Sequence, residues 1–353
     1  MRYRFLDEHT FWREIDILVT IRDVAKRAGV SVPTVSRVLN KHPGVGEELV
    51  ARTLAAIADL NYHPSRAAQQ LRTQDSGRVA VVFSDLSNQF HISVLKGIEQ
   101  VLSVEGISIT IGNADQDPKR EAALIDIVLS DNAKGLIIAP TREDVPAVER
   151  AVEQGLPVVV VDRRMRNVAV DTIYTDSAKG AQDAVRHLIE LGNQRVAMIS
   201  GPIHLTSAQD RYSGYMQAIS DAAISFDPSL LRFGDYRQES GYRLARELMG
   251  LEQPPSAIFV ANNAMTIGAL NAIHEMGRAI PEEIAIVGFD EVDWAISLNP
   301  PLTTVAQSPV EIGVGAATML LERIAGKATS ARTIVRDTSL QIRASCGAEL
   351  RPK

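Results

Sequence analysis

Cysteine is almost absent from this sequence of 353 residues, in which Cys346 is the single one. One thiol cannot form an internal disulfide, and a metal site built on cysteine needs several. We therefore expect a protein of the reducing cytoplasm with no structural metal.

Long hydrophobic runs are also missing. The longest, such as LPVVVVD at 156–162, have the length of a strand and fall far short of the roughly 20 residues that cross a bilayer. The first 19 residues mix charges with apolar side chains and lack the apolar core of a secretory signal. This pattern predicts neither a membrane segment nor export.

Catalytic motifs are lacking as well. The sequence has no G-x-S-x-G elbow, no H-E-x-x-H pair and no Walker loop, and its seven histidines are scattered. GVGAAT at 313–318 fails the dinucleotide fingerprint because Thr318 replaces the final small residue, and it reads as the interior of a helix. An enzyme is thus the weaker class of hypothesis, and we expect no catalytic residue and no cofactor.

Charge is distributed unevenly along the chain. Residues 20–73 contain eight Lys or Arg and four Asp or Glu, which gives this segment a net charge of +4. The net charge of the whole chain is -6, so the other residues together carry -10. Aromatic residues make up only 5%, while small and branched aliphatic residues abound, as in buried parallel strands. A basic segment on an acidic body indicates a polyanionic partner for that segment alone.

The basic segment contains DVAKRAGVSVPTVSRVLN at 23–40, which has the pattern of two helices joined by a tight turn. Gly29 can adopt the left-handed conformation that ends a helix, and Ser31 can cap the next one. The second helix then has one apolar stripe at i, i+3 and i+4, formed by Val35, Val38 and Leu39.

A third amphipathic helix is predicted over 47–62. Its apolar residues recur with helical spacing at Leu49, Leu54, Ile57 and Leu60. After Pro64, the segment 65–73 has good helix formers but few apolar residues, so it would be marginal as a free helix.

From residue 78 short β-rich runs alternate with longer helical stretches. This βα alternation predicts parallel sheets, whose ligands bind beyond the carboxyl ends of the strands. The predicted strands are 78–83, 107–112, 135–139, 157–162, 195–200, 257–261 and 284–290. The predicted helices lie near 90–105, 117–131, 143–154, 177–191, 208–223, 237–250 and 263–276.

Two parts of the chain resemble the lactose-repressor (LacI/GalR) family. TIRDVAKRAGVSVPTVSRVLN with LNYHPSRAAQQL looks like the DNA-binding headpiece, and GFD with PPLTTVAQ resembles the effector domain. The resemblance implies an all-α helix-turn-helix headpiece and an α/β core like periplasmic binding proteins, with two Rossmann-like parallel-sheet subdomains. It covers about residues 20 to 346.

The implied domain limits follow from the same resemblance. They are an extension at 1–19, a headpiece at 20–64, a hinge helix and linker at 65–77, an effector-binding and dimerisation domain at 78–346, and a tail at 347–353. The N-subdomain would take about 78–162 and 292–322, and the C-subdomain about 163–291 and 323–346, with crossings near 162, 291 and 322. We expect residues 1–18 to be flexible and dispensable, because Val19 could be an alternative start.

The headpiece residues implied to contact DNA lie on both helices and in the hinge. Val32 and Pro33 offer only apolar contact, so Arg37 is the main polar reader, with guanine as its natural partner. Leu71 matches the leucine that the family inserts into the minor groove. The full set is Thr20, Ser31, Val32, Pro33, Thr34, Ser36, Arg37, Asn40, Ala68 and Leu71.

The effector cleft is similar to that of ribose-type binding proteins. Carboxylates, amides and arginines suit the paired donors and acceptors of vicinal hydroxyls, and an aromatic face covers the apolar side of a sugar. The matching residues are Asn88, Phe90, Asp162, Arg163, Arg211, Asn262, Asp290 and Gln307. The chain departs from that pattern at Gln89 and His91, so the ligand need not be ribose.

These observations favour a DNA-binding transcriptional regulator. The resemblance implies a repressor of carbohydrate-utilisation genes that acts on near-palindromic operator DNA and is released by a sugar-like inducer. A corepressor-dependent repressor stays open as an alternative, and a solute-binding protein or an enzyme is less well supported. No heptad of leucines follows Cys346, so we expect a homodimer.

Overall fold

The computed structural model describes residues 19–39, 42–62 and 77–348, and the predictions for 1–18, Asn40, Ala68 and Leu71 lie outside these ranges. The chain divides into two compact units, one up to Gln74 and one from Asp75 onward. Each unit is a domain with its own core, as the sequence predicts.

The described residues of the first unit form three helices, α1 (Ile21–Ala28), α2 (Val32–Leu39) and α3 (Glu47–Asp59). Gly29 ends α1 in the left-handed region, with φ +64°. The Arg52 side chain of α3 donates a hydrogen bond of 2.7 Å to the carbonyl oxygen of Ala28, and so caps the same helix end. The turn between the first two helices is therefore fixed from both sides.

The inner face of α3 differs from the prediction. Leu49 and Leu54 are 37% and 52% exposed, whereas Thr53 and Ala56 are buried. The Thr53 hydroxyl donates to the carbonyl oxygen of Leu49 at 2.7 Å, which satisfies this polar group inside the helix. The prediction from hydrophobicity placed the wrong face of α3 inside. Ala56 and the hydrogen-bonded Thr53 allow the helices to pack more closely than leucine does.

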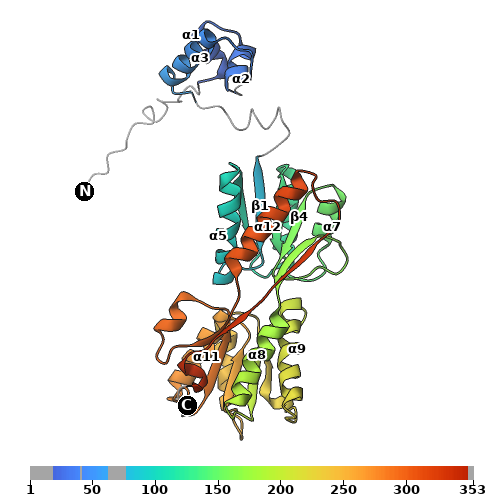
Figure 1. Ribbon diagram of the computed structural model, residues 1–353, viewed down its shortest axis with the longest axis vertical. Coiled ribbons are helices and arrows are strands. Elements are labelled where there is room, and N and C mark those ends of the chain that lie inside the picture. Colours follow the sequence, from blue (N-terminus) through green and yellow to red (C-terminus); the bar gives the residue numbers. More distant parts are fainter. Residues whose placement is uncertain (1–18, 40–41, 63–76, 349–353) are drawn as a thin grey trace, which may run out of the picture. The chain divides into compact units, whose positions relative to one another are not determined.

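The second unit consists of two subdomains, which Figure 1 shows one above the other. The first sheet has the order β11-β5-β4-β3-β1-β2 and the second the order β12-β10-β9-β8-β6-β7. All neighbours are parallel except β10 and β12. The two parallel-sheet subdomains predicted from the sequence are thus confirmed.

The first sheet comprises β1 (Arg78–Phe83), β2 (Ser108–Asn113), β3 (Gly135–Ala139), β4 (Val158–Val161), β5 (Asp171–Thr175) and β11 (Thr333–Arg336). Alternate side chains pack against two pairs of helices. These helices are α5 (Gln89–Val104) with α12 (Pro309–Ile324), and α6 (Pro118–Ser130) with α7 (Pro146–Glu153). GVGAAT lies inside α12, as predicted.

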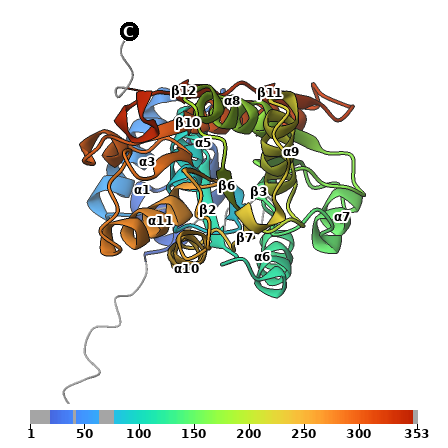
Figure 2. The ribbon, with the colours of Figure 1, turned by 90° about the horizontal axis from the view of Figure 1, so that it is seen from below.

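The second sheet comprises β6 (Val196–Ser200), β7 (Leu231–Phe233), β8 (Ala257–Val260), β9 (Ala285–Phe289), β10 (Thr303–Ala306) and β12 (Ser339–Gln341). Its helices are α8 (Ser177–Glu190), α9 (Thr206–Asp221), α10 (Gln238–Met249) and α11 (Asn263–Glu275). Figure 2 shows α10 and α11 on the side of this sheet away from α8.

The crossings between the subdomains lie later in the sequence than expected. β5 pairs with β4 and β10 pairs with β9, so the chain changes subdomain after Thr175 and after Ala306 rather than near 162 and 291. The third crossing falls between β11 and β12, not near 322. The sequence-based limits missed these strands because threonine supplies much of them, and buried threonines such as Thr303 do not register as an apolar run.

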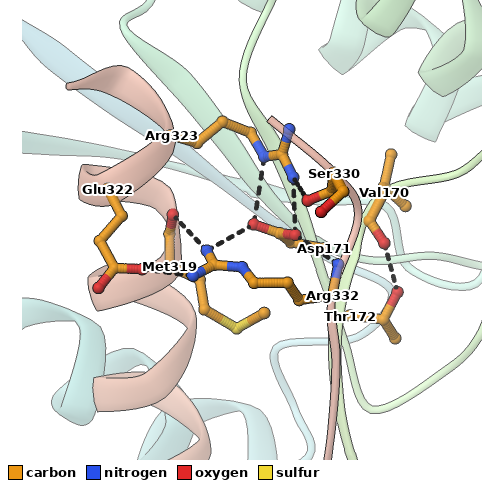
Figure 3. A network of polar contacts seen from close by, with 8 residues as sticks. All are labelled: Val170, Asp171, Thr172, Met319, Glu322, Arg323, Ser330 and Arg332. Atoms are coloured by element: carbon orange, nitrogen blue, oxygen red, sulfur yellow. Dashed lines mark hydrogen bonds and ion pairs between the residues drawn. The ribbon is translucent and has the colours of Figure 1, made fainter. Parts of the chain in front are cut away.

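One buried carboxylate connects three segments of the first subdomain (Figure 3). Asp171 at the start of β5 is fully buried and accepts hydrogen bonds from the Arg323 side chain at 3.1 and 2.7 Å. Arg332 donates to the same carboxylate from its backbone at 2.8 Å and from its guanidinium at 2.9 Å, and also pairs with Glu322. This network fixes β11 beside β5 and against the end of α12.

Candidate functional site

A cleft between the two sheets brings together all of the predicted effector residues. Asn88, Phe90, Asp162 and Arg163 line it from the first subdomain, and Arg211, Asn262 and Asp290 line it from the second. Gln307 lies where the chain crosses between them. The space left between these walls is about 20 Å³, which is too small for a drug-sized or sugar-sized molecule.

The first wall begins at the N-terminus of α5. Asn88 caps this helix, and its side-chain oxygen accepts a hydrogen bond of 3.0 Å from the backbone N–H of Phe90. The same oxygen accepts a second hydrogen bond, of 3.2 Å, from the Asn263 amide of the other subdomain. Phe90 is buried beside His91, with ring centroids 5.7 Å apart. The cap therefore places an amide and an aromatic ring at the cleft.

Asp162 follows β4 directly and has a φ of +67°. The N–H of Arg163 donates to the carbonyl oxygen of Val161 at 2.7 Å, which closes a tight turn around this aspartate. Burial works against ionisation here, but the nearby His91 ring and the charge of Arg163 prevail and hold the pKa of Asp162 below its usual value. This wall of the cleft thus carries an ionised carboxylate.

Two buried arginines face the cleft from opposite subdomains. Arg163 donates to the carbonyl oxygen of Pro140, and Arg211 donates to that of Ala261 at 2.6 Å. The guanidinium of Arg211 lies 3.9 Å from the centroid of the Phe289 ring, a cation–π contact. The Nε atoms of both arginines have no hydrogen-bond partner among the residues that the structure describes. Each arginine is held in place and retains a buried donor for a ligand.

Asp290 follows β9 and accepts two hydrogen bonds. One comes from the backbone N–H of Asn263 at 3.3 Å, and the other from the Gln307 side chain at 2.5 Å. Burial nevertheless raises the pKa of Asp290, because it outweighs the nearby charge of Arg211 and these hydrogen bonds. Gln307 keeps a buried side-chain oxygen with no partner in the described part of the chain.

Asn262 has a mainly structural position. It caps α11, with its side-chain oxygen accepting from the backbone N–H of Met265 at 3.0 Å. Its side-chain nitrogen donates to the carbonyl oxygen of Tyr236 at 3.1 Å. Both polar groups of this side chain thus already have partners, and they hold Tyr236 in the second wall.

Further residues line the cleft beyond those predicted: Asp85, His91, Gln116, Ser207 and Tyr236. His91 was recognised only as a departure from the ribose-type pattern. Its Nδ1 lies 2.6 Å from the carbonyl oxygen of Asp85, and its Nε2 lies 3.8 Å from the carboxylate of Asp162. Tyr236 follows β7, which is too short to be recognised as a strand, and a Cβ on Gly201 would lie 2.1 Å from its ring. The absence of a side chain at Gly201 therefore makes room for the Tyr236 ring, and this glycine is the only indication of it in the sequence.

The predicted DNA contacts of the headpiece lie on or beside α2. Val32, Pro33 and Arg37 are exposed, and Arg37 has no ion pair with any described residue. Ser31 precedes the helix, and its hydroxyl accepts a hydrogen bond of 3.3 Å from the backbone N–H of Thr34. Ser36 is half-buried on the same helix. The exposed side of α2 thus carries both an apolar pair and a cation.

Thr20 has a different neighbourhood, at the start of α1. Its hydroxyl donates to the Asp23 carboxylate at 2.7 Å, and its backbone N–H donates to the same carboxylate at 2.8 Å. These bonds stabilise the first turn of α1.

Within the described ranges, no group of three or more His, Cys, Asp or Glu residues is arranged to hold a metal ion. No helix there has the length and apolar character needed to cross a bilayer.

Two family models match the chain. Residues 20–65 match the bacterial regulatory proteins of the lacI family, and residues 185–346 match a periplasmic binding protein-like domain. The first match covers the three-helix unit, and the second covers most of the C-subdomain together with α12 and β11. The two matches agree with the two described units of the structure.

Individual proteins are similar over nearly the whole chain. The transcriptional repressor PurR of Histophilus somni is 31% identical over 311 residues, which are 88% of this chain and 93% of that protein. A Lac repressor dimer bound to operator and an anti-inducer is 28% identical with a TM-score of 0.84, and a complex of the regulator CelR with cellobiose is 29% identical with a TM-score of 0.72. Both structures cover 93% of this chain and are themselves covered to 99%. A helix-turn-helix unit, a two-walled effector cleft and full-length similarity to repressors together show that this chain belongs to the lacI family of bacterial regulatory proteins.

Proposed function

We propose that this protein represses carbohydrate-utilisation genes and leaves its operator when a sugar or a sugar-derived molecule binds in the cleft. It acts as a homodimer on near-palindromic DNA, with one headpiece on each half-site. The Lac repressor, which aligns with 93% of this chain, was solved as a dimer on operator DNA, and this supports the proposal. A DNA partner also fits a cytoplasmic protein associated with the nucleoid.

The observation that carries the sugar assignment is a set of buried polar atoms without partners at the cleft. They are Nε of Arg163 and of Arg211, Nε2 of His91, the hydroxyl of Tyr236 and Oε1 of Gln307, which have no hydrogen-bond partner among the described residues. A buried polar group left unpaired costs about 1–3 kcal/mol. Vicinal hydroxyls both donate and accept, so a polyol can satisfy such atoms together.

The charge of the walls narrows the class of ligand. Asp85, Asp162 and Asp290 line the cleft together with Arg163 and Arg211, so the cleft has no excess of positive charge to attract an anion. Phe90 adds one apolar face of the kind that covers a sugar ring. A neutral polyhydroxylated molecule therefore fits better than a sugar acid or a sugar phosphate. The CelR structure with bound cellobiose supports a carbohydrate for this architecture.

In the headpiece, the exposed cation of Arg37 supports the reading of a guanine in the major groove. We assign apolar contacts beside it to Val32 and Pro33. We assign contacts with phosphates to the hydroxyl groups of Thr20, Ser31, Thr34 and Ser36. Asn40, Ala68 and Leu71 belong to the proposed DNA contacts on the resemblance alone.

The test begins with operator fragments selected from random DNA by the full-length protein. Pentoses, hexoses, sugar acids and nucleosides are then screened by thermal shift. A labelled operator is titrated with and without each molecule that raises the melting temperature. We expect a neutral sugar to raise this temperature and to weaken operator binding.

Other outcomes have separate meanings. A ligand that strengthens operator binding would make the protein a corepressor-dependent repressor. A sugar that is chemically converted, as followed by NMR, would make it an enzyme. If no sugar binds but an anionic compound does, the assignment of the cleft is wrong.

A further inference from the structure

Polar side chains join the two subdomains directly, apart from the crossing strands. These contacts lie around the cleft, and each has one partner in either subdomain. The pairs are Arg164 with Asp210, Glu143 with Gln209, Asp115 with Arg237, and Asn88 with Asn263.

The Arg164–Asp210 pair has the strongest geometry of these. Arg164 donates from both terminal nitrogens to the two carboxylate oxygens of Asp210, at 2.6 and 2.8 Å. Its backbone N–H also donates to the hydroxyl of Thr206 at 3.0 Å. The guanidinium lies 4.8 Å from the centroid of the Tyr174 ring. A two-point ion pair that rests on an aromatic face has little freedom to move.

The other charged pair across the cleft is weaker. Arg237 and Asp115 are 47% and 45% exposed, and Asp115 also pairs with Arg120. Exposed pairs of this kind contribute little, because water and salt screen their charges. The side chains of Arg164 and Asp210 are only 35% and 23% exposed, so water and salt screen them less.

The pair is built on the same elements as the cleft walls. Arg164 directly follows Asp162 and Arg163 in the turn after β4. Asp210 precedes Arg211 on α9, which also lines the cleft. A ligand-binding turn and a ligand-binding helix are thus tied to each other by neighbouring residues that do not line the cleft.

We propose that Arg164 and Asp210 are positioning residues that hold the two walls of the cleft together and thereby set the affinity for the effector. The effector needs both walls, so its apparent affinity is reduced in proportion to the fraction of molecules whose walls are apart. Removing the pair lowers the closed population without removing a ligand contact. The inference rests on the proposed function only in that the cleft closes on an effector.

The test measures the separation of the subdomains in the full-length protein without any ligand. Spin labels are attached at Lys119→Cys on α6 and Glu239→Cys on α10, two exposed positions on opposite sides of the cleft. Cys346 is buried, so labelling is selective for the introduced thiols. Pulsed electron resonance then gives the distribution of distances between the labels.

We expect the protein with the unsubstituted Arg164–Asp210 pair to favour the short distance between the labels. Arg164→Gln should shift the ratio of closed to open molecules about tenfold toward open, which lies within the range of coupling between sites in proteins. Asp210→Asn should have the same effect, and the double variant should add little to either single one. Arg164→Lys, which keeps the charge but loses the second hydrogen bond, should lie between. Arg150→Gln removes an ion pair to Asp126 inside the first subdomain and should change nothing.

The result that overturns the inference is a distance distribution in Arg164→Gln and Asp210→Asn that matches the Arg150→Gln control. A distribution dominated by the long separation before any substitution would overturn it equally. Circular dichroism of each variant identifies any that fail to fold, and Arg164→Lys then provides the comparison. The label distances are measured without an effector, so they are independent of the sugar screen. The proposed function can therefore fail while this inference holds, and this inference can fail while the proposed function holds.

Discussion

Asp162 and Asp290 occupy equivalent positions in the two subdomains. Each follows the strand at the same place in its sheet, β4 or β9, and each has a positive φ, +67° and +81°. Each donates its backbone N–H to the next strand, to Ile173 at 3.1 Å and to Val305 at 3.0 Å. Their pKa values nevertheless shift in opposite directions, downward for Asp162 and upward for Asp290. The repeated architecture therefore presents two different carboxylates to one ligand.

Asp290→Asn should stabilise the protein at neutral pH. Burial raises the pKa of Asp290, so the folded state takes up a proton more readily than the unfolded state, and the stability of the unsubstituted protein falls as pH rises through that range. The asparagine carries no charge and can still accept from Gln307. The melting temperature of the variant should exceed that of the unsubstituted protein at pH 7.5 and approach it near pH 4. The reverse trend would show that the charge of Asp290 is well compensated.

Asp162→Asn should behave in the opposite way. The pKa of Asp162 is lowered, so its ionised form adds stability above the ordinary aspartate range, and this stability is lost as pH falls toward the lowered pKa. The variant should melt at a lower temperature than the unsubstituted protein at pH 7.5, with the difference closing in acid. Thermal unfolding at several pH values tests both aspartates in one series.

Asp290→Ala should also separate the two functions of the chain. Operator affinity should be nearly unchanged, because Asp290 lies in the unit from Asp75 onward and the proposed DNA contacts lie before it. The response to the sugar found in the screen should be lost. An operator titration with and without this sugar measures both, and a variant that responds at an unchanged sugar concentration would place the ligand elsewhere.

Asp171→Asn should destabilise the second unit by about 3 kcal/mol, because it removes the buried carboxylate that pairs with Arg323 and leaves Arg332 with Glu322 alone. The matched control is Asp126→Asn, which removes an exposed pair with Arg150 and should cost less than about 1 kcal/mol. Urea unfolding followed by circular dichroism compares them. Equal losses would mean that the network of Figure 3 adds no more than a surface pair.

Arg37→Ala should reduce binding to the selected operator by about 1–3 kcal/mol and relax the preference at one guanine in each half-site. Arg27→Ala is the control, because Arg27 is an exposed cation of the same unit, held by Asp59 at 2.5 Å. It should weaken selected and random DNA alike, through loss of charge. If Arg37→Ala also lowers both to the same degree, Arg37 contacts phosphate and not a base.

Much of the fold was predictable because its main signals are local. β1, β3 and β6 are apolar runs of strand length, and the turn at Gly29 has the left-handed conformation that glycine favours. The strands β5 and β10 were missed because buried threonines such as Thr172 and Thr304 satisfy β geometry without being hydrophobic. The crossing positions, which depend on these strands, were misplaced with them.

The cleft was predictable in membership but not in detail. Residues such as Asn88 and Asp290 follow recognisable strands, so their convergence at the sheet edges follows from the βα pattern. Burial dominates at Asp290 and raises its pKa, whereas at Asp162 His91 and Arg163 outweigh burial and lower it. Neither the degree of burial nor the approach of His91, which is distant in sequence, can be read from a local pattern. Tyr236 depends in the same way on a gap left by Gly201.

The positions of β11 and β12 have a consequence for synthesis of the chain. Both are edge strands, one in each sheet, and they come from residues 333–341 at the far end of the sequence. A growing chain can therefore form the helices α1, α2 and α3 early, whereas each core sheet lacks one edge strand until residues 333–341 have left the ribosome. During that interval β5 and β10 present open edges in one nascent polypeptide. Production of this protein should therefore be sensitive to translation speed and to chaperones that shield strand edges.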